Sequence, residues 1–168
     1  MSAANHVVRA AQKLVAPVVL RAALSFAGAG LVVAVWNTAA PFAHGWWLVS
    51  FLLLVGALAQ SLLGAGRTAI VRTAPRVPVP RWGTRGQAVL WNAGTLLVAV
   101  GVLASTRLGV VIGSVLLLCA LAALASELRA GAASAARTQV ERGYAALLAF
   151  LAASVVVGTA LAWDLPWA

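Results

Sequence analysis

The sequence contains few of the side chains on which most enzymes depend. Its 168 residues include three acidic residues, two histidines and one cysteine. Acid–base catalysis relies on carboxylate and imidazole groups, and the sequence shows no nucleophile–base pair, phosphate-binding loop or paired carboxylates. One cysteine cannot form an intrachain disulfide, so we interpret Cys119 as a small buried apolar residue. We therefore expect no enzymatic activity, no cofactor and no metal.

Charged residues of every kind are scarce. They make up 9% of the chain, whereas hydrophobic residues make up 63%. Soluble globular domains contain about 25% charged and about 45–50% apolar residues. These residues cannot cover a water-soluble domain of this length with a polar surface, so we expect a membrane protein.

Long apolar runs are what the chain does contain. A helix of about 20 apolar residues crosses a hydrocarbon core of about 30 Å, and a helix satisfies all of its backbone hydrogen bonds internally. The runs are continuously apolar rather than alternating, which excludes barrel strands. The sequence therefore predicts an all-α bundle of five transmembrane helices in a single domain, residues 1–168, with spans at 18–37, 46–66, 87–105, 108–128 and 143–163.

The basic residues predict the orientation of these spans. They gather in the N-terminal segment and in the loops 67–86 and 129–142, whereas the opposite side carries only Arg107. Lys and Arg mark cytoplasmic loops, so we expect a cytoplasmic N-terminus and an external C-terminus. This topology accounts for the net charge of +9 without binding to nucleic acid.

Two cytoplasmic segments are expected to contact lipid. In residues 5–18, apolar and polar side chains separate onto opposite helical faces, which predicts a short amphipathic interfacial helix before Pro17 turns the chain into the first span. In the loop 66–86, prolines favour an extended path without helix. Its arginines are expected to contact anionic headgroups, although a docking strip for an acidic partner is an alternative: Arg67, Arg72, Arg76, Arg81 and Arg85.

Small and polar residues within the spans predict helix-packing seams. Gly56 and Gly64 lie four residues on either side of Gln60, so another helix can approach and receive a hydrogen bond from the amide. Asn92, beside an interfacial Trp91, offers a second amide. Two small-xxx-small pairs follow, at Gly109 and Gly113 and at Ser154 and Gly158. The sequence leaves open whether they pack within the chain or against a neighbour. Alternatively, Gln60, Asn92 and Ser114 contact a hydrophobic ligand in a cavity.

Two further sites involve ionisable residues. Arg21 and Glu127 are predicted at similar depth near the cytoplasmic side, where they could form an ion pair between helices. His44 precedes Trp46 and Trp47 at the outer end of the second span, which is typical of an aromatic belt that anchors a helix end. The alternative is a haem ligand, but His6 lies across the bilayer from His44 and cannot complete the same site.

One resemblance concerns the second and third spans. The stretch FLLLVGALAQSLLG places Gly56, Gln60 and Gly64 at intervals, and LWNAG supplies Asn92 and Gly94 after a basic loop. This pattern resembles small membrane proteins that are distantly similar to the catalytic subunit of haem–copper oxidases. Phe51 stands where that family has a haem-ligand histidine, so a haem is implied only if His44 substitutes for it.

The sequence thus predicts a non-catalytic integral membrane protein. We expect a structural or accessory subunit that packs in a homo-oligomer or in a larger complex of the cytoplasmic membrane, such as a respiratory complex. Its partners would be the lipid bilayer and other membrane subunits or further copies of itself. The alternatives are a carrier of a hydrophobic small molecule or lipid, and a b-type haem protein that uses His44. The composition, rich in Ala, Val and Arg, favours a bacterial inner membrane.

Overall fold

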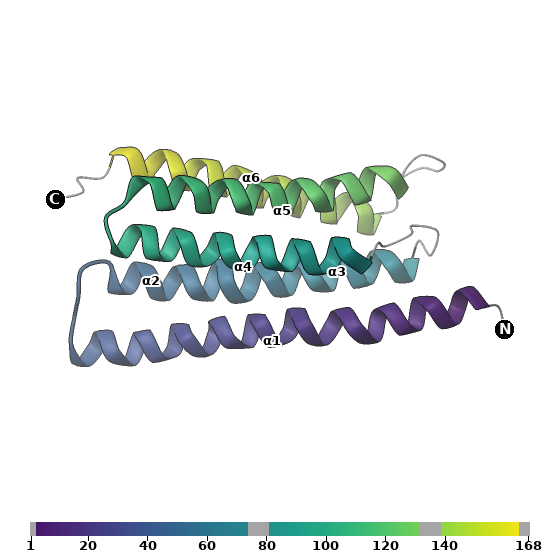
Figure 1. The fold of residues 1–168 in the computed structure, drawn as a ribbon, viewed down its shortest axis with the longest axis horizontal. Helices are drawn as coiled ribbons and strands as arrows, with labels where there is room; N and C mark the ends of the chain where they lie inside the picture. Colours follow the sequence, from purple (N-terminus) through teal and green to yellow (C-terminus); the bar gives the residue numbers. More distant parts are fainter. Residues whose placement is uncertain (1–2, 74–80, 132–138, 165–168) are drawn as a thin grey trace.

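The computed structural model describes the backbone of residues 3–73, 81–131 and 139–164, and the side chains of 19–70, 86–129 and 139–160. Within these ranges the secondary structure is entirely helical (Figure 1). The elements are α1 (Ala3–Ala39), α2 (Gly45–Phe51), the π-helix η1 (Leu52–Ala59), α3 (Gln60–Thr73), α4 (Arg81–Leu103), α5 (Arg107–Gly131) and α6 (Gln139–Asp164).

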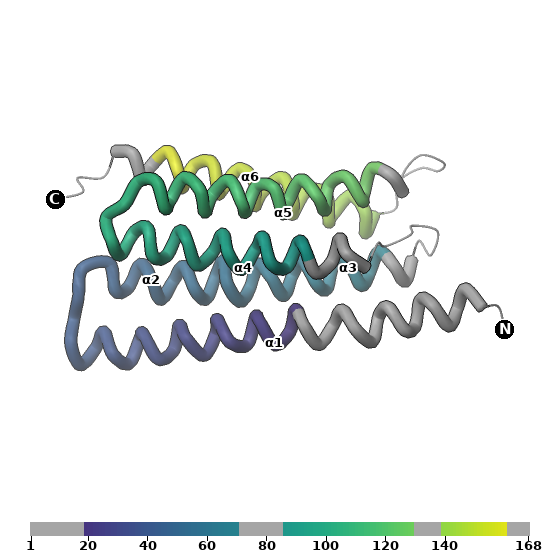
Figure 2. The backbone as a smooth tube through the Cα atoms, viewed as in Figure 1, coloured from purple at the N-terminus to yellow at the C-terminus, as the bar shows by residue number. Residues whose placement is uncertain are grey.

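Five helices are long and apolar enough to cross a membrane, which confirms the expected number. They are Val19–Ala39, Gly45–Ile70, Gly86–Leu103, Arg107–Arg129 and Gln139–Ala160. The second combines α2, η1 and α3 in one continuous rod. The helices alternate in direction along the bundle, as the tube in Figure 2 shows. The start of α1 and the end of α6 therefore lie at opposite ends of the bundle.

The predicted loop 66–86 is wrong at both of its ends. Helix α3 continues to Thr73, and α4 already begins at Arg81. The physical reason is the position of the prolines, which occupy only residues 75–80. A proline restricts the residue before it but leaves more distant residues free to form helix. The prolines themselves lie outside the described residues, as does Arg76.

The predicted turn at Pro17 is also wrong. Helix α1 runs without a break from Ala3 to Ala39, so residues 5–18 and the first span form one helix. A proline removes a single backbone donor, and the helix on both sides keeps its remaining hydrogen bonds. Prolines are tolerated in membrane helices for this reason.

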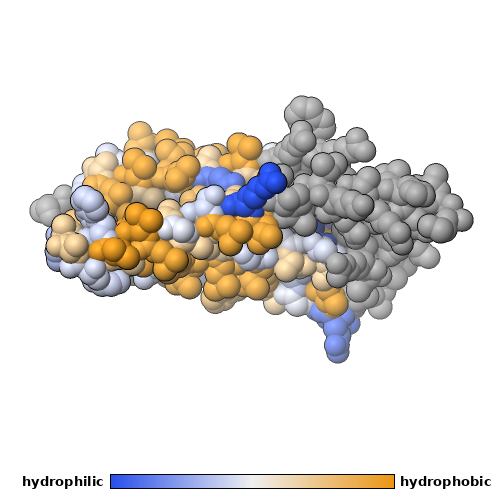
Figure 3. Space-filling view, turned by 90° about the horizontal axis from the view of Figure 1, so that it is seen from below, coloured by the Kyte–Doolittle hydropathy of each residue, from blue (hydrophilic) through white to orange (hydrophobic). Residues whose placement is uncertain are grey.

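The core lies between four of the five spans. One cluster of buried side chains joins η1, α3, α4, α5 and α6, and includes Leu63, Trp91, Leu121 and Leu148. A smaller cluster, with Phe26, Leu48, Leu52 and Ala99, attaches α1 to this four-helix core. In the first and last spans 11% of the most apolar window is buried, against 44% in the third. The outer helices therefore offer most of their surface to the surroundings, and Figure 3 shows patches of hydrophobic residues on the described part of one face.

The contact between α4 and α5 is the closest in the bundle. A Cβ atom added to Gly94 would lie 2.8 Å from the carbonyl oxygen of Gly113, and one added to Gly113 would lie 2.7 Å from the backbone nitrogen of Val98. One added to Gly101 would lie 2.6 Å from the nitrogen of Val110. Only glycine permits the two backbones to approach to this distance.

The connection between α4 and α5 is correspondingly short. The N–H of Thr106 donates to Gly101 O at 2.8 Å, and that of Ser105 donates to Val102 O at 3.2 Å. Ser105 has a φ of 52°, so this is the Schellman arrangement with serine at the position that glycine usually occupies. It reverses the chain within three residues and holds the α4–α5 hairpin together.

Candidate functional site

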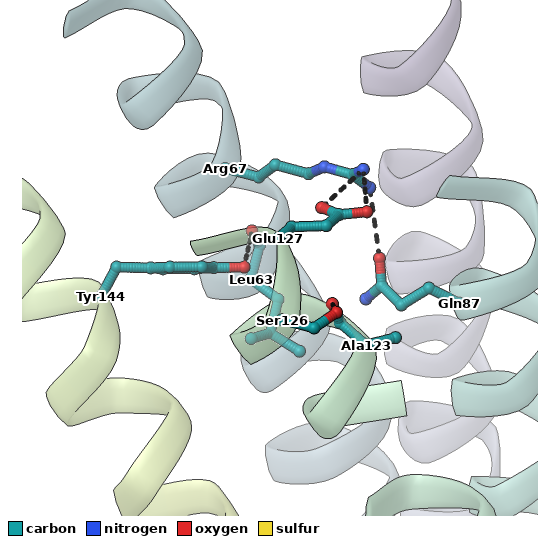
Figure 4. A network of polar contacts seen from close by, with 7 residues as sticks. All are labelled: Leu63, Arg67, Gln87, Ala123, Ser126, Glu127 and Tyr144. Atoms are coloured by element: carbon teal, nitrogen blue, oxygen red, sulfur yellow. Dashed lines mark hydrogen bonds and ion pairs between the residues drawn. The ribbon is translucent and has the colours of Figure 1, made fainter. Parts of the chain in front are cut away.

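A buried polar cluster connects three spans near one end of the bundle (Figure 4). The Nη2 of Arg67, on α3, contacts both carboxylate oxygens of Glu127, on α5, at 3.0 and 2.9 Å. Its Nη1 donates to the Oε1 of Gln87, on α4, at 3.4 Å. Because the side chains of Arg67 and Glu127 are only 10% and 22% exposed, this pair is shielded from solvent far more than a surface ion pair.

A fourth span joins the same region through Tyr144 of α6. Its hydroxyl donates to Leu63 O at 3.4 Å, and its ring packs over Gly66. The alternating direction of the helices explains the meeting. Arg67 and Glu127 lie near the ends of the second and fourth spans, whereas Gln87 and Tyr144 lie near the starts of the third and fifth. All four are therefore at one end of the bundle.

The predicted ion pair between Arg21 and Glu127 is wrong. Glu127 takes Arg67 as its partner, while Arg21 is exposed on the outer helix α1. Arg67 is correspondingly not available to lipid headgroups, because it is 8% exposed and lies on a helix rather than in a loop. Among the other arginines expected to contact headgroups, Arg72, Arg81 and Arg85 belong to α3 and α4.

Gln60 is the first residue of α3 and lies about two helical turns from Arg67. It is 4% exposed. Its flanking glycines receive α1: a Cβ atom on Gly56 would lie 2.6 Å from the ring of Phe26, and one on Gly64 would lie 2.9 Å from Val19. The helix expected to approach this face is thus α1. The Oε1 of Gln60, however, has no hydrogen-bond partner.

Gln60 and Arg67 both line a small cavity. It has a volume of about 20 Å³ and is lined by Val19, Gln60, Leu63, Gly64, Arg67, Gln87, Ala88 and Trp91. A water molecule needs about 10–15 Å³ of such space, so the cavity has room for about one water molecule. The cavity therefore suits water rather than a lipid or a drug-sized molecule. The Nε of Arg67 also lacks a hydrogen-bond partner. Two residues that line the cavity, Gln60 and Arg67, therefore each have one unpaired polar atom.

Trp91 has a role that the sequence did not reveal. It is 1% exposed within the bundle, and its indole N–H donates to Val55 O at 3.3 Å. Val55 lies within η1, where the hydrogen bonds of a π-helix span five residues rather than four. Side chains that insert beside a helix ladder are a known cause of such distortions. One signal for this burial is present in the sequence: Trp91 lies four residues after Gln87, where the third predicted span begins.

The remaining packing residues divide into two groups. Gly109 and Gly113 contact α4, so this pair is used within the chain. Ser154 and Gly158 are exposed on α6; the serine bonds only to Phe150 O of its own helix, and nothing lies within 4 Å of a Cβ added to Gly158.

Ser114 contacts the hydroxyl of Thr159 at 2.8 Å, away from the cavity beside Gln60. The Oδ1 of Asn92 is buried without a partner.

His44 lies at the opposite end of the bundle, immediately before α2. It is exposed, makes no capping hydrogen bond through its side chain, and has a left-handed φ of 64°. Histidine is enriched several-fold among residues that adopt this conformation. Within the described residues, no three His, Cys, Asp or Glu side chains gather as metal ligands would. Cys119, expected to be buried, is exposed on α5.

Comparison with protein-family models, curated proteins and solved structures gave no match.

Proposed function

We propose that the chain is a non-catalytic structural or accessory subunit of a cytoplasmic membrane, where it assembles with further copies of itself or with other membrane subunits. The observation that carries this proposal is the exposed pair Ser154 and Gly158 on α6. In the same chain, Gly109 and Gly113 have the same spacing and are covered by α4. Small residues at this spacing allow two helices to pack closely in lipid.

The low burial of the outer helices α1 and α6 supports an assembly. Both α1 and α6 leave most of their spans uncovered, and Gly28 of α1 has open space beside it as Gly158 does. Gly is unfavourable in a helix interior by about 1 kcal/mol relative to Ala, and an uncovered glycine makes no helix contact in the monomer that would offset this cost. A helix from a neighbouring subunit would make use of the close approach that glycine permits.

Other observations favour a subunit over the alternative functions. A carrier needs a cavity that holds its cargo. The cavity lined by Gln60 and Trp91 has room for about one water molecule. A b-type haem needs an axial ligand directed into a bundle, whereas His44 occupies an exposed turn. The buried Arg67–Glu127 pair joins two helices of the same chain, which suits a structural role.

The orientation and membrane belong to the same proposal. Basic residues concentrate at the end of the bundle that contains Arg67, which favours a cytoplasmic location for that end. The aromatic residues near Gly45, among them Trp46 and Trp47, then lie at the outer interface. Accessibility of single cysteines at Ser105 and Gly143 to a membrane-impermeant maleimide, in a Cys119→Ala background, tests this orientation.

The assembly is tested by its mass and by one pair of variants. Extraction in mild detergent followed by light scattering should give an oligomer, and Gly158→Leu should shift it to smaller species. Ala160→Leu adds similar bulk on the other flank of α6, so it should leave the mass unchanged. Folded wild-type chain that is monomeric after extraction, and that forms no intermolecular cross-links in membranes beforehand, would contradict the proposal.

A further inference from the structure

The cavity that Gln60 and Arg67 line has unpaired polar atoms in its lining residues, although it lies between membrane helices. Two buried atoms of its lining residues have no partner: the Oε1 of Gln60, which accepts hydrogen bonds, and the Nε of Arg67, which donates one. The two residues are 4% and 8% exposed. A buried polar group without a partner costs about 1–3 kcal/mol, so two such groups at one cavity call for a ligand.

The chemistry of the two atoms selects the ligand. A cation would satisfy Gln60 but would face the guanidinium of Arg67. An anion would satisfy Arg67 but would face the carbonyl oxygen of Gln60, and Glu127 already neutralises the arginine. A neutral molecule that both donates and accepts satisfies both atoms. The volume of about 20 Å³ restricts this molecule to the size of water.

We infer that this cavity is a binding site for water, which donates to the Oε1 of Gln60 and accepts from the Nε–H of Arg67. The ordered water extends the polar cluster from Glu127 and Gln87 through Arg67 to Gln60, two turns deeper along α3. It also completes the hydrogen bonding of a charged side chain within the bundle. Gly28, Ser154 and Gly158 do not line the cavity, so its water can be tested separately from the proposed assembly.

The test is magnetisation transfer from water to the Arg67 Nε–H in the full chain, labelled with ¹⁵N-arginine and measured by solid-state NMR in lipid bilayers. Arg67→Lys assigns the resonance by its loss. We expect rapid transfer from water in the wild type and a several-fold slower transfer in Gln60→Met, which removes the acceptor with little change of volume. Ser61→Ala, on the exposed side of the same turn, is the control and should leave the transfer unchanged.

Several results would overturn the inference. They are an absence of water transfer to Arg67 in the folded wild type, transfer from lipid glycerol protons in its place, or transfer that is equally fast in folded Gln60→Met. A shift of the Nε resonance on exchange of chloride for iodide would instead assign the cavity to an anion. The wild-type measurement decides the matter even if Gln60→Met does not fold.

Discussion

Arg67 and Glu127 are 60 residues apart in sequence, yet the Nη2 of the arginine lies 2.9 Å from the Oε2 of the glutamate. The pair joins α3 to α5, which are separated in the chain by the whole of α4. A buried charge that loses its partner is strongly destabilising, by about 3 kcal/mol or more, whereas replacing both members by apolar residues is often close to neutral. This relationship gives the first prediction.

Arg67→Met should lower the free energy of unfolding by about 3 kcal/mol, because it leaves the Glu127 carboxyl group without its partner between helices. The double variant with Glu127→Leu should recover much of this loss. Unfolding in mixed micelles with increasing dodecyl sulfate measures both. The matched control is Arg21→Met, which removes an exposed charge and should change stability little. A larger loss in Arg21→Met than in Arg67→Met would refute the pairing.

The second prediction concerns the α4–α5 contact. Gly113→Ala places a Cβ atom within 2.8 Å of the backbone of α4, and backbone atoms cannot move aside as a flexible side chain can. Forcing extra atoms into a packed interior costs about 1–3 kcal/mol, so the thermal midpoint should fall. Gly143→Ala is the control. Its Cβ meets nothing within 4 Å, and the higher helix propensity of alanine should leave the midpoint unchanged or raise it.

How far the sequence could anticipate the fold depended on the range of the interaction. Hydrophobic runs are local, so five spanning helices follow from the positions of the apolar runs. The partner of Glu127 depends on which helices are neighbours, and a span-by-span depth estimate could not distinguish Arg21 from Arg67. The helical ends of the loop 66–86 do not follow from its prolines, because a proline restricts the residue before it and not residues several positions away. Within the π-helix at 52–59, Val55 and Gly56 contact α4 and α1, and no local pattern reports these contacts.

Trp91 provides a third prediction. Trp91→Phe keeps most of the buried aromatic surface but removes the indole N–H that donates to Val55 O. A net loss of about 1 kcal/mol is typical for one hydrogen bond, and here the carbonyl is left in a segment shielded from water. Chemical denaturation of the purified protein should show this decrease. Trp46→Phe, at a residue that is 61% exposed, should have a smaller effect; equal effects would argue against the interaction between Trp91 and η1.

The last prediction separates the two interpretations of His44. If the residue serves the turn before α2, asparagine should replace it without loss, because asparagine also tolerates a left-handed φ of 64°. His44→Val should destabilise the protein, since a β-branched residue is strained in that conformation. If His44 is a haem ligand, the result should differ: both variants would lose a Soret absorption band that the wild type possesses. Visible spectra and thermal midpoints of the three proteins therefore decide the question. We expect no Soret band in any of them and a lowered midpoint in His44→Val alone, because the backbone conformation rather than the imidazole is what this position requires.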